Sequence, residues 1–405
     1  MRRRLYIALI SLVAAAGVVA QNAASSPYSL FGVGELNDNV PNAFRAMGGV
    51  GVGMRNNHVI NMMQPASYTA CDSLTFMFDI AASASWANYS DANGRRNRAN
   101  GNIEYVTVQI PIWRQHIAVS LGTTPYSAAG YKLAVDGSEQ GKECTYSYTK
   151  SYYGEGSISQ IYGGASFNLF DWVAVGGNFY YLFGSTTAYT DLTFNTSGMT
   201  DVSQISYFHV SSFRYRLGAQ VFHTFGEHNF TVGAIFESKM PLKSEGYYIE
   251  TYSDFASDTA SLNYEIPLTF GIGGSYCYDN RLTVAFDYLH QRWSEVKNDD
   301  ALRDRNRFAI GLEYRDSPNA RSYIRRMMWR VGANLGSSYV MPVSGLEYTV
   351  SAGVGFPLHG IGTHINFSLE YTHRQGAIPA YPKDNSLKFT INVAVAENWF
   401  FKRRL

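Results

Sequence analysis

Charged side chains recur on the polar faces of alternating segments in the second half of this sequence. Both signs occur, at Arg214, Arg216, Asp287, Arg307, Glu313, Arg330 and Glu370. Opposite charges on one side of a sheet can pair and hold another segment, or they can bind the anionic headgroup of a ligand. The mixture of signs favours ion pairing and predicts no strong selectivity for anions.

Other residues offer little chemistry. Neither His223 with His228 nor His359 with His364 has ligand spacing on a helix, and no catalytic motif surrounds any of the many serines. The three cysteines, Cys71, Cys144 and Cys277, are odd in number and widely spaced, so they form no disulfide framework. We therefore expect no enzyme activity, no metal and no cofactor, and the net charge of +1 predicts no nucleic-acid partner.

The elements that carry these charges are period-2 stripes, with an oily face and a face of small or polar residues. In one of them Phe308, Ile310 and Leu312 alternate with Arg307, Ala309 and Gly311. Fourteen such stripes lie near residues 74–86, 102–112, 116–128, 157–168, 171–184, 213–221, 228–238, 262–276, 282–288, 308–314, 329–335, 348–356, 365–371 and 389–395.

This pattern predicts an all-β fold, a 14-stranded antiparallel transmembrane β-barrel. In lipid every backbone N–H and C=O group must be hydrogen-bonded within the protein, so only helices and closed barrels span a membrane. Charged residues make up 16% of the chain and aromatic residues 15%, with 30 Tyr, which suits a barrel with aromatic girdles. A soluble sandwich would also alternate, but it does not readily explain Gly and Arg sharing the polar face through a dozen strands.

The connections between the stripes alternate in length. Short links lie near residues 113–115, 170–171, 226–227, 279–280 and 359–360, and long polar stretches lie at 87–101, 129–156, 185–205, 239–260, 295–303 and 376–385. Two links break the rule: the one near Pro342 is short where a long one is due, and 317–327 is long and rich in Arg. An even number of strands predicts that both termini are periplasmic. To keep the number even, Thr145 to Tyr153 must be a hairpin arm within a loop.

The N-terminus carries a separate signal. Arg2, Arg3 and Arg4 precede an apolar run from Leu5 to Val19, which is typical of a secretory signal peptide cleaved near Ala20. We therefore divide the chain into a signal peptide (1–20), an N-terminal segment (21–73) that does not alternate, and the barrel (74–405), located in the outer membrane.

Within the N-terminal segment, the run from Arg45 to Gly51 reads Arg-Ala-Met-Gly-Gly-Val-Gly, and Gln64-Pro65-Ala66 follows it. This pair of motifs resembles the FadL/TodX-like outer-membrane transport family, which also includes the shuttle barrel of type IX secretion. Gln64 stands where that family has Asn. The resemblance implies a fourteen-stranded barrel whose lumen holds the N-terminal segment as a hatch.

The resemblance also implies site residues. In the hatch, the residues expected to meet a ligand or to position the hatch are Leu30, Phe31, Arg45, Met47, Gly48, Gly49 and Pro65. The family has a kinked third strand that opens the wall laterally, and here Gly122 and Pro125 lie in the third strand. Pro cannot donate to a ladder, so Pro125 marks either such a kink or the end of the strand.

Two functions remain open. The first is passive uptake of hydrophobic, fatty-acid-like molecules, with a hatch and a lateral exit. The second is a non-transporting barrel that serves as a subunit or carrier in protein secretion of the type IX kind. The expected partners are outer-membrane lipid and either a hydrophobic small molecule or secretion proteins. A continuous apolar cavity that reaches a gap in the wall would favour uptake, and a lumen filled by salt bridges would favour the second function.

Overall fold

The computed structural model describes twelve stretches of the chain. They are residues 26–91, 94–113, 115–140, 145–195, 198–252, 255–257, 264–297, 302–317, 320–340, 346–358, 362–375 and 382–398. The expected signal peptide, Cys144, His359 and the link at 341–345 with Pro342 lie outside them.

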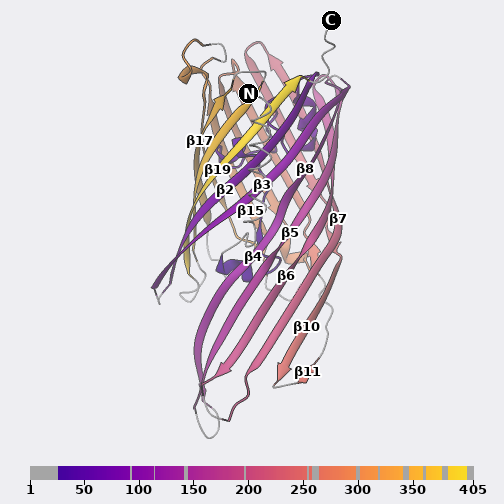
Figure 1. The fold of residues 1–405 in the computed structure, drawn as a ribbon. Helices are drawn as coiled ribbons and strands as arrows, with labels where there is room; N and C mark the ends of the chain where they lie inside the picture. Colours follow the sequence, from indigo (N-terminus) through magenta and orange to yellow (C-terminus); the bar gives the residue numbers. More distant parts are fainter. Residues whose placement is uncertain are drawn as a thin grey trace, which may run out of the picture.

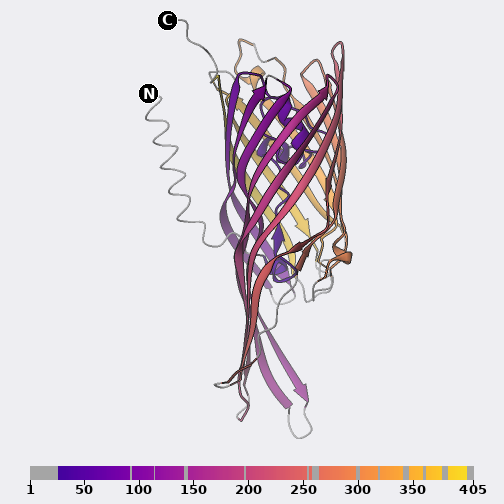
Figure 2. The ribbon, with the colours of Figure 1, turned by 90° about the vertical axis from the view of Figure 1, so that its right-hand side faces the viewer.

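Fourteen antiparallel strands form a closed barrel, as the alternation predicts (Figures 1 and 2). Neighbours in sequence pair around the ring, and β19 closes it against β2, from Lys383 with Ser90 to Asn398 with Thr75. The strands are β2 (Thr75–Asp91), β3 (Gly94–Trp113), β4 (Ile117–Gln140), β5 (Thr145–Phe170), β6 (Val173–Phe194), β7 (Val202–Phe225), β8 (His228–Glu237), β13 (Thr269–Tyr278), β14 (Leu282–Gln291), β15 (Arg305–Tyr314), β16 (Met328–Gly336), β17 (Glu347–Pro357), β18 (His364–Arg374) and β19 (Lys383–Asn398).

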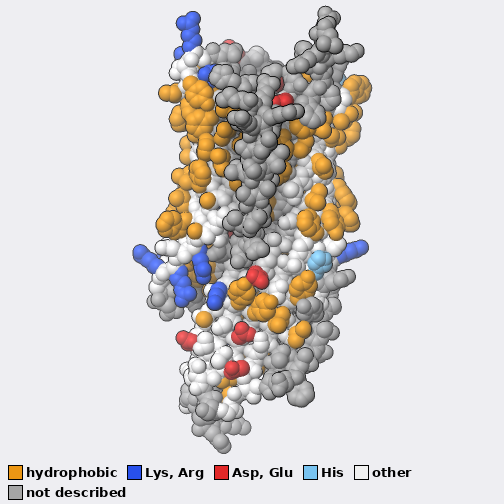
Figure 3. Space-filling model, in the orientation of Figure 1, with side chains coloured by type: hydrophobic (Ala, Val, Ile, Leu, Met, Phe, Trp, Pro, Cys, Tyr) orange, Lys and Arg blue, Asp and Glu red, His pale blue; other side chains and the backbone are white. Residues whose placement is uncertain are grey.

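The oily stripes form a band around the outside of the barrel. On β15, Phe308 and Ile310 are each 57% exposed, whereas Arg307 and Ala309, which alternate with them, point inward and are buried. Figure 3 shows the hydrophobic side chains around the upper part of the barrel, with charged side chains gathered below them. Lipid can contact the apolar face, and the lumen receives the polar face.

Several predicted loops are in fact strands that continue beyond this band. The stretches 87–101, 129–156 and 185–205 belong largely to the paired hairpins β2–β3, β4–β5 and β6–β7. Thr145 to Tyr153 does form a hairpin arm, but it is the first part of β5 and pairs with β4, so it does not lie within a loop. The prediction was wrong because both faces are polar outside the membrane, so the period-2 signal disappears while the backbone ladder continues.

Besides β1, which is described below, four short strands are not part of the ring. β10 (Ser244–Tyr252) pairs with the far end of β7 and with β11 (Phe255–Ser257), which lengthens the projecting sheet. β9 (Met240–Leu242) pairs with β12 (Tyr264–Ile266). This pair and η3 (Trp293–Glu295) lie at the same end of the barrel as the projecting sheet. Figure 1 shows the resulting extension on one side of the barrel, below β4 to β7.

The opposite rim carries the short turns. The β13–β14 turn uses Asp279 and Asn280, both with positive φ (50° and 51°), which matches the twist of a two-residue hairpin. β2 begins and β19 ends at this rim. The β15–β16 link at 317–327 is long here, as predicted, and contains η4 (Ile324–Arg326). The link near Pro342 is not short, because β16 ends at Gly336 and β17 begins at Glu347.

Residues 26–74, here called the lumen segment, run inside the barrel. They form η1 (Pro27–Leu30), the two-residue β1 (Glu35–Leu36), α2 (Asn42–Arg45) and η2 (Pro65–Ala70). Most of residues 40–69 are buried against the inner wall, with Met47 and Val50 fully covered. None of the described helices is long and apolar enough to cross a membrane.

The band and the extension predict different responses to the same substitution. Ile310 lies at the centre of β15 within the band, and Val135 lies on the part of β4 beyond it; each is 57% exposed. We expect Ile310→Arg to lower the free energy of unfolding in lipid vesicles by about 2–4 kcal/mol, because the charge enters hydrocarbon. We expect Val135→Arg to change it by less than about 0.5 kcal/mol. Urea titration followed by electrophoretic mobility measures both, and equal losses would show that the band is misplaced.

Candidate functional site

The lumen segment meets the wall through backbone packing that side chains would block. A Cβ on Gly311 would lie 2.3 Å from the Met47 carbonyl oxygen, and one on Gly332 would lie 2.1 Å from the Met47 carbonyl carbon. Gly48 has φ +73°, and a Cβ there would lie 2.5 Å from the Ala333 oxygen. Met47 and Gly48 therefore lie directly on the wall, in contact with β15 and β16.

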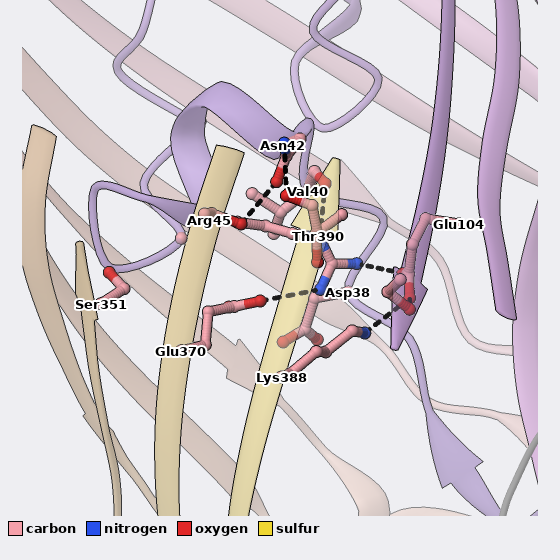
Figure 4. A network of polar contacts seen from close by, with 12 residues as sticks. Asp38, Val40, Asn42, Arg45, Glu104, Ser351, Glu370, Lys388 and Thr390 are labelled. Atoms are coloured by element: carbon pink, nitrogen blue, oxygen red, sulfur yellow. Dashed lines mark hydrogen bonds and ion pairs between the residues drawn. The ribbon is translucent and has the colours of Figure 1, made fainter. Parts of the chain in front are cut away.

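Arg45 anchors the segment to the wall in the network drawn in Figure 4. Its Nη2 lies 2.8 Å from Glu104 Oε2 on β3, and its Nη1 lies 3.7 Å from Glu370 Oε2 on β18. Lys388 Nζ on β19 reaches the other Glu104 oxygen at 2.6 Å. A single buried carboxylate thus joins the lumen segment to the strands that flank the barrel closure.

Asn42 makes a neutral contact beside this network. Its Nδ2 donates to the Asn366 carbonyl at 3.0 Å and to Asn392 Oδ1 at 3.1 Å, and its Oδ1 accepts from the Ser368 hydroxyl at 2.6 Å. These bonds hold the start of α2 against β18 and β19. They also satisfy every polar atom of the buried Asn42 amide.

Asp38 forms a second ion-pair centre. Its carboxylate receives both Nη atoms of Arg305, at 2.6 and 2.9 Å, and lies 3.3 Å from Arg307 Nη1. Burial raises the pKa of Asp38, but the two guanidinium groups outweigh it and hold this pKa well below its usual range. Arg307 also donates to the Gly49 carbonyl at 2.8 Å, so it joins two parts of the lumen segment.

Asp287 receives three successive backbone amides of the segment. The amide of Gly51 donates to Oδ2, that of Val52 to the same oxygen at 2.7 Å, and that of Gly53 to Oδ1 at 3.1 Å. This arrangement is an anion-binding nest filled by a side chain of the wall. These three amides are therefore not available to bind a ligand.

Arg214 and Arg216 on β7 share Glu237 on β8 as their ion-pair partner. Arg214 also donates to Gln160 Oε1 at 2.9 Å and lies over the ring of Tyr180, 4.1 Å from its centroid. On the other side of the lumen, Arg330 donates to Glu313 at 2.6 Å and to Asn366 Oδ1 at 2.7 Å. All seven charged residues singled out in the sequence thus line the lumen and have protein partners.

Gln64 and Pro65 fix the second motif. Gln64 Nε2 donates to the carbonyls of Ala219 on β7 and Ala234 on β8, at 3.2 and 3.1 Å. Gln64 therefore forms hydrogen bonds to the barrel wall, although the FadL/TodX-like family has Asn at this position. Pro65 begins η2 and lies against Gly176 and Gly218, where a Cβ would meet it.

Leu30 and Phe31 lie elsewhere. Leu30 is the last residue of η1 and Phe31 follows it; both are half-buried, and Tyr339 donates a hydrogen bond to the Phe31 carbonyl at 3.1 Å. Neither lines any of the cavities described below. Cys71 and Cys277 are free thiols.

Sequence reasoning missed Asp38, Asn42, Glu104 and Glu237. Glu104 and Glu237 carried a usable signal, because each is a carboxylate inside a strand and would need a buried partner. Asp38 and Asn42 carried none, because they precede the motif in a stretch without periodicity.

The lumen cavity is small and highly charged. It has a volume of about 260 Å³ and lies on the long-hairpin side of the segment. Six acidic and six basic side chains line it: Glu35, Asp38, Glu104, Glu347, Glu370 and Asp384, with Arg45, Arg98, Arg305, Arg307, Arg374 and Lys388. This cavity is polar and balanced in charge, which does not suit a hydrocarbon.

The wall is interrupted between β3 and β4. Their ladder runs from Trp113 with Ile117 to Val106 with Thr123 and then stops, whereas β4 continues to Gln140 and stays paired with β5. Pro125 follows two residues later, and the β4–β5 register shifts between Pro125 and Ser127. Pro125 therefore does not end the strand, and it lies where pairing with β3 is lost.

The lumen segment covers the edge of β4 beyond this point. β1 pairs with it through Glu35 with Ala128 and Leu36 with Ser127, and the Asn37 amide donates to the Tyr126 carbonyl at 2.9 Å. The close approach requires glycine at position 34, where φ is +91° and a Cβ would lie 2.6 Å from the Ala128 oxygen. An exposed strand edge is thereby supplied with backbone partners.

A second cavity, of about 490 Å³, opens at the interruption. Here it is called the gap cavity, and its lining comes from both separated strands and from Pro27, Tyr89, Tyr153, Gly154 and Pro382. Tyr89, Arg98 and Asn100 line both this cavity and the lumen cavity, so the two adjoin.

Removal of one shared charge tests how firmly the segment is held. The Glu104 side chain is fully buried between Arg45 and Lys388. We expect Glu104→Gln to cost about 3–5 kcal/mol, because it removes the ion-pair partner of Lys388 and leaves Arg45 only its longer contact with Glu370. Urea titration measures the loss, and limited proteolysis reports cleavage within residues 26–74.

Glu139→Gln is the control, because Glu139 is exposed on β4 beyond the band and forms no ion pair with any described residue. It should change stability by less than about 0.5 kcal/mol. If the two variants behave alike, the ion pairs do not hold the segment.

Among solved structures, the barrel is similar to a FadL homologue from Pseudomonas aeruginosa, with a TM-score of 0.61, 11% identity and coverage of 89% of this chain and 98% of that chain. It is similar to the monoaromatic hydrocarbon channel CymD, with a TM-score of 0.59, 14% identity and coverage of 89% and 98%. The toluene transporter TbuX from Ralstonia pickettii gives a TM-score of 0.56, 15% identity and coverage of 87% and 97%. At such identities these likenesses show the fold.

Comparison with curated proteins finds no match. The model of one family, described as BamG, matches residues 1–405, which is the whole chain. The FadL-like outer-membrane barrel described above therefore belongs to the BamG family.

Proposed function

We propose that this protein acts as a closed-lumen barrel subunit of an outer-membrane protein secretion or assembly machinery, and not as an open channel. The packing of the lumen segment carries the proposal. On the short-turn side, the Tyr68 carbonyl accepts from Gln109, the Ala66 carbonyl from Ser166, and the Met54 carbonyl from Gln220, at 2.8 to 3.0 Å. These bonds come from three different parts of the wall, so solute would have to break many of them to pass.

The orientation follows from the turns. Short turns are typical of the periplasmic rim and long connections of the outer one. We therefore place the start of β2 and the end of β19 at the periplasm, and the β4–β7 extension outside the cell. A paired sheet that projects beyond the membrane is a firm surface for another protein, whereas a diffusion channel has no need of it.

Photo-cross-linking in cells tests the subunit role. A photoreactive residue at Val135, on the extension, should give one discrete protein adduct, to be identified by mass spectrometry. The same residue at Ile310 has equal exposure but faces lipid, and it should give none. In parallel, the purified barrel in planar bilayers should conduct no better than a protein-free membrane. Steady conductance without any adduct at Val135 would contradict the proposal.

A second candidate is uptake of a hydrophobic molecule through the wall. Two observations favour it: the FadL-like fold and the gap cavity beside Pro125. In this candidate Gly122 and Pro125 produce the lateral opening, and the lumen segment acts as the hatch. The charged lumen cavity is the observation against it.

Filling the gap cavity tests this route. Ala134 lines the cavity, whereas Ala188 on β6 does not. If uptake uses the opening, Ala134→Trp should slow the entry of a labelled fatty acid into vesicles by about tenfold, and Ala188→Trp should leave it unchanged. No protein-dependent entry, or equal entry with both variants, would exclude the lateral route.

A further inference from the structure

The gap cavity differs from the lumen cavity in its charge. Arg95, Arg96, Arg98 and Lys132 line it, and none of the described residues that line it is Asp or Glu. None of these four side chains forms an ion pair with any described residue, whereas the basic residues of the lumen cavity are mostly paired. Four cations around one cavity repel each other, so a negatively charged occupant would stabilise them.

The depth of the cavity indicates where the occupant comes from. Trp86 on β2 is 61% exposed and pairs with Ala99 on β3, and Tyr89 pairs with Arg96. Exposed Trp is typical of the interface between hydrocarbon and headgroups. The arginines follow this position directly, so they lie at headgroup level. Figure 3 shows basic side chains gathered just below the hydrophobic band.

The interruption of the wall makes both faces of β3 accessible. Arg96 and Arg98 pair with Tyr89 and Ala87, which line the cavities on the inner side. Arg95 alternates with Arg96 and therefore projects from the opposite face of the strand. All three nevertheless line one cavity, because β3 has no ladder with β4 at this height in the described part of the chain.

From these observations we propose that the gap cavity binds the phosphate group of an outer-leaflet glycolipid. The guanidinium groups match phosphate oxygens in charge and in fork geometry. The cavity lies at the edge of the lipid band and is also lined by Leu133 and Ala134, which provide apolar surface for the lipid portion. A volume of about 490 Å³ is adequate for a phosphorylated sugar. The choice of leaflet rests on the orientation proposed above, whereas the site itself holds whether or not the barrel conducts.

Binding of a defined lipid to the full-length purified barrel tests this site. The probes are a bis-phosphorylated disaccharide lipid, its dephosphorylated form and inorganic phosphate, measured by native mass spectrometry and by titration in detergent. We expect the phosphorylated lipid to bind at least about tenfold more tightly than either other probe, and less tightly as salt rises.

The triple variant R95Q/R96Q/R98Q should weaken that binding by about 10- to 100-fold, as expected for the loss of one or two charge-assisted contacts. The matched control R321Q/R325Q/R326Q removes three charges from the opposite rim and should change binding by less than about twofold. Retained electrophoretic heat-modifiability shows that each variant is folded. Should the triple variant not fold, the single variants Arg96→Gln and Arg98→Gln should each weaken binding about threefold or more.

Equal binding of phosphorylated and dephosphorylated lipid would overturn the proposal, and so would undiminished binding by the arginine variants. Binding of inorganic phosphate as tight as that of the lipid would overturn the lipid assignment. The photo-cross-linking result at Val135 is independent of all three outcomes, so the failure of this site and the failure of the subunit role are distinguishable.

Discussion

Buried charge on the inner wall determines where the lumen segment lies. Arginines and carboxylates belong on the inner face because the lipid face would penalise them, but the inner face then needs counter-ions or amides. The segment supplies them: Asp38 for Arg305 and Arg307, Arg45 for Glu104, and three consecutive amides for Asp287. Without these partners, only water entering the lumen could solvate the charges of the inner wall. The barrel and its contents therefore form one electrostatic unit.

This balance limits what the lumen can do. In a hydrocarbon channel the pathway would have to be largely apolar, whereas the lumen cavity here has equal numbers of acidic and basic side chains. The gap cavity at the β3–β4 interruption is lined by cationic side chains and adjoins this balanced interior. The FadL-like architecture is thus combined with an interior chemistry that favours binding and positioning over passage.

The sequence was sufficient to predict the barrel, because one oily face per strand is a strong signal wherever lipid covers that face. All fourteen strands, the closure of β19 on β2 and the inward position of Arg214 or Arg330 follow from it. The length of the hairpins did not follow, since residues such as those of β5 before Ser157 are polar on both faces. The partners of the charges were also unpredictable. Glu104 and Arg45 meet only because the lumen segment folds back inside the ring, and the periodicity of the sequence does not predict the course of that segment.

The placement of the lumen segment has a consequence for the order of events during folding. It precedes β2 in the chain, yet Arg45, Asn42 and Gly51 contact β18, β19 and β14, hundreds of residues later. Contacts this distant in sequence form slowly. The β2–β19 ladder completes the ring from Lys383 with Ser90 to Asn398 with Thr75, next to the strands that contact the segment. We expect the segment to be gathered while the sheet is still open, so that the final seam encloses it and closure commits the molecule to its filled state.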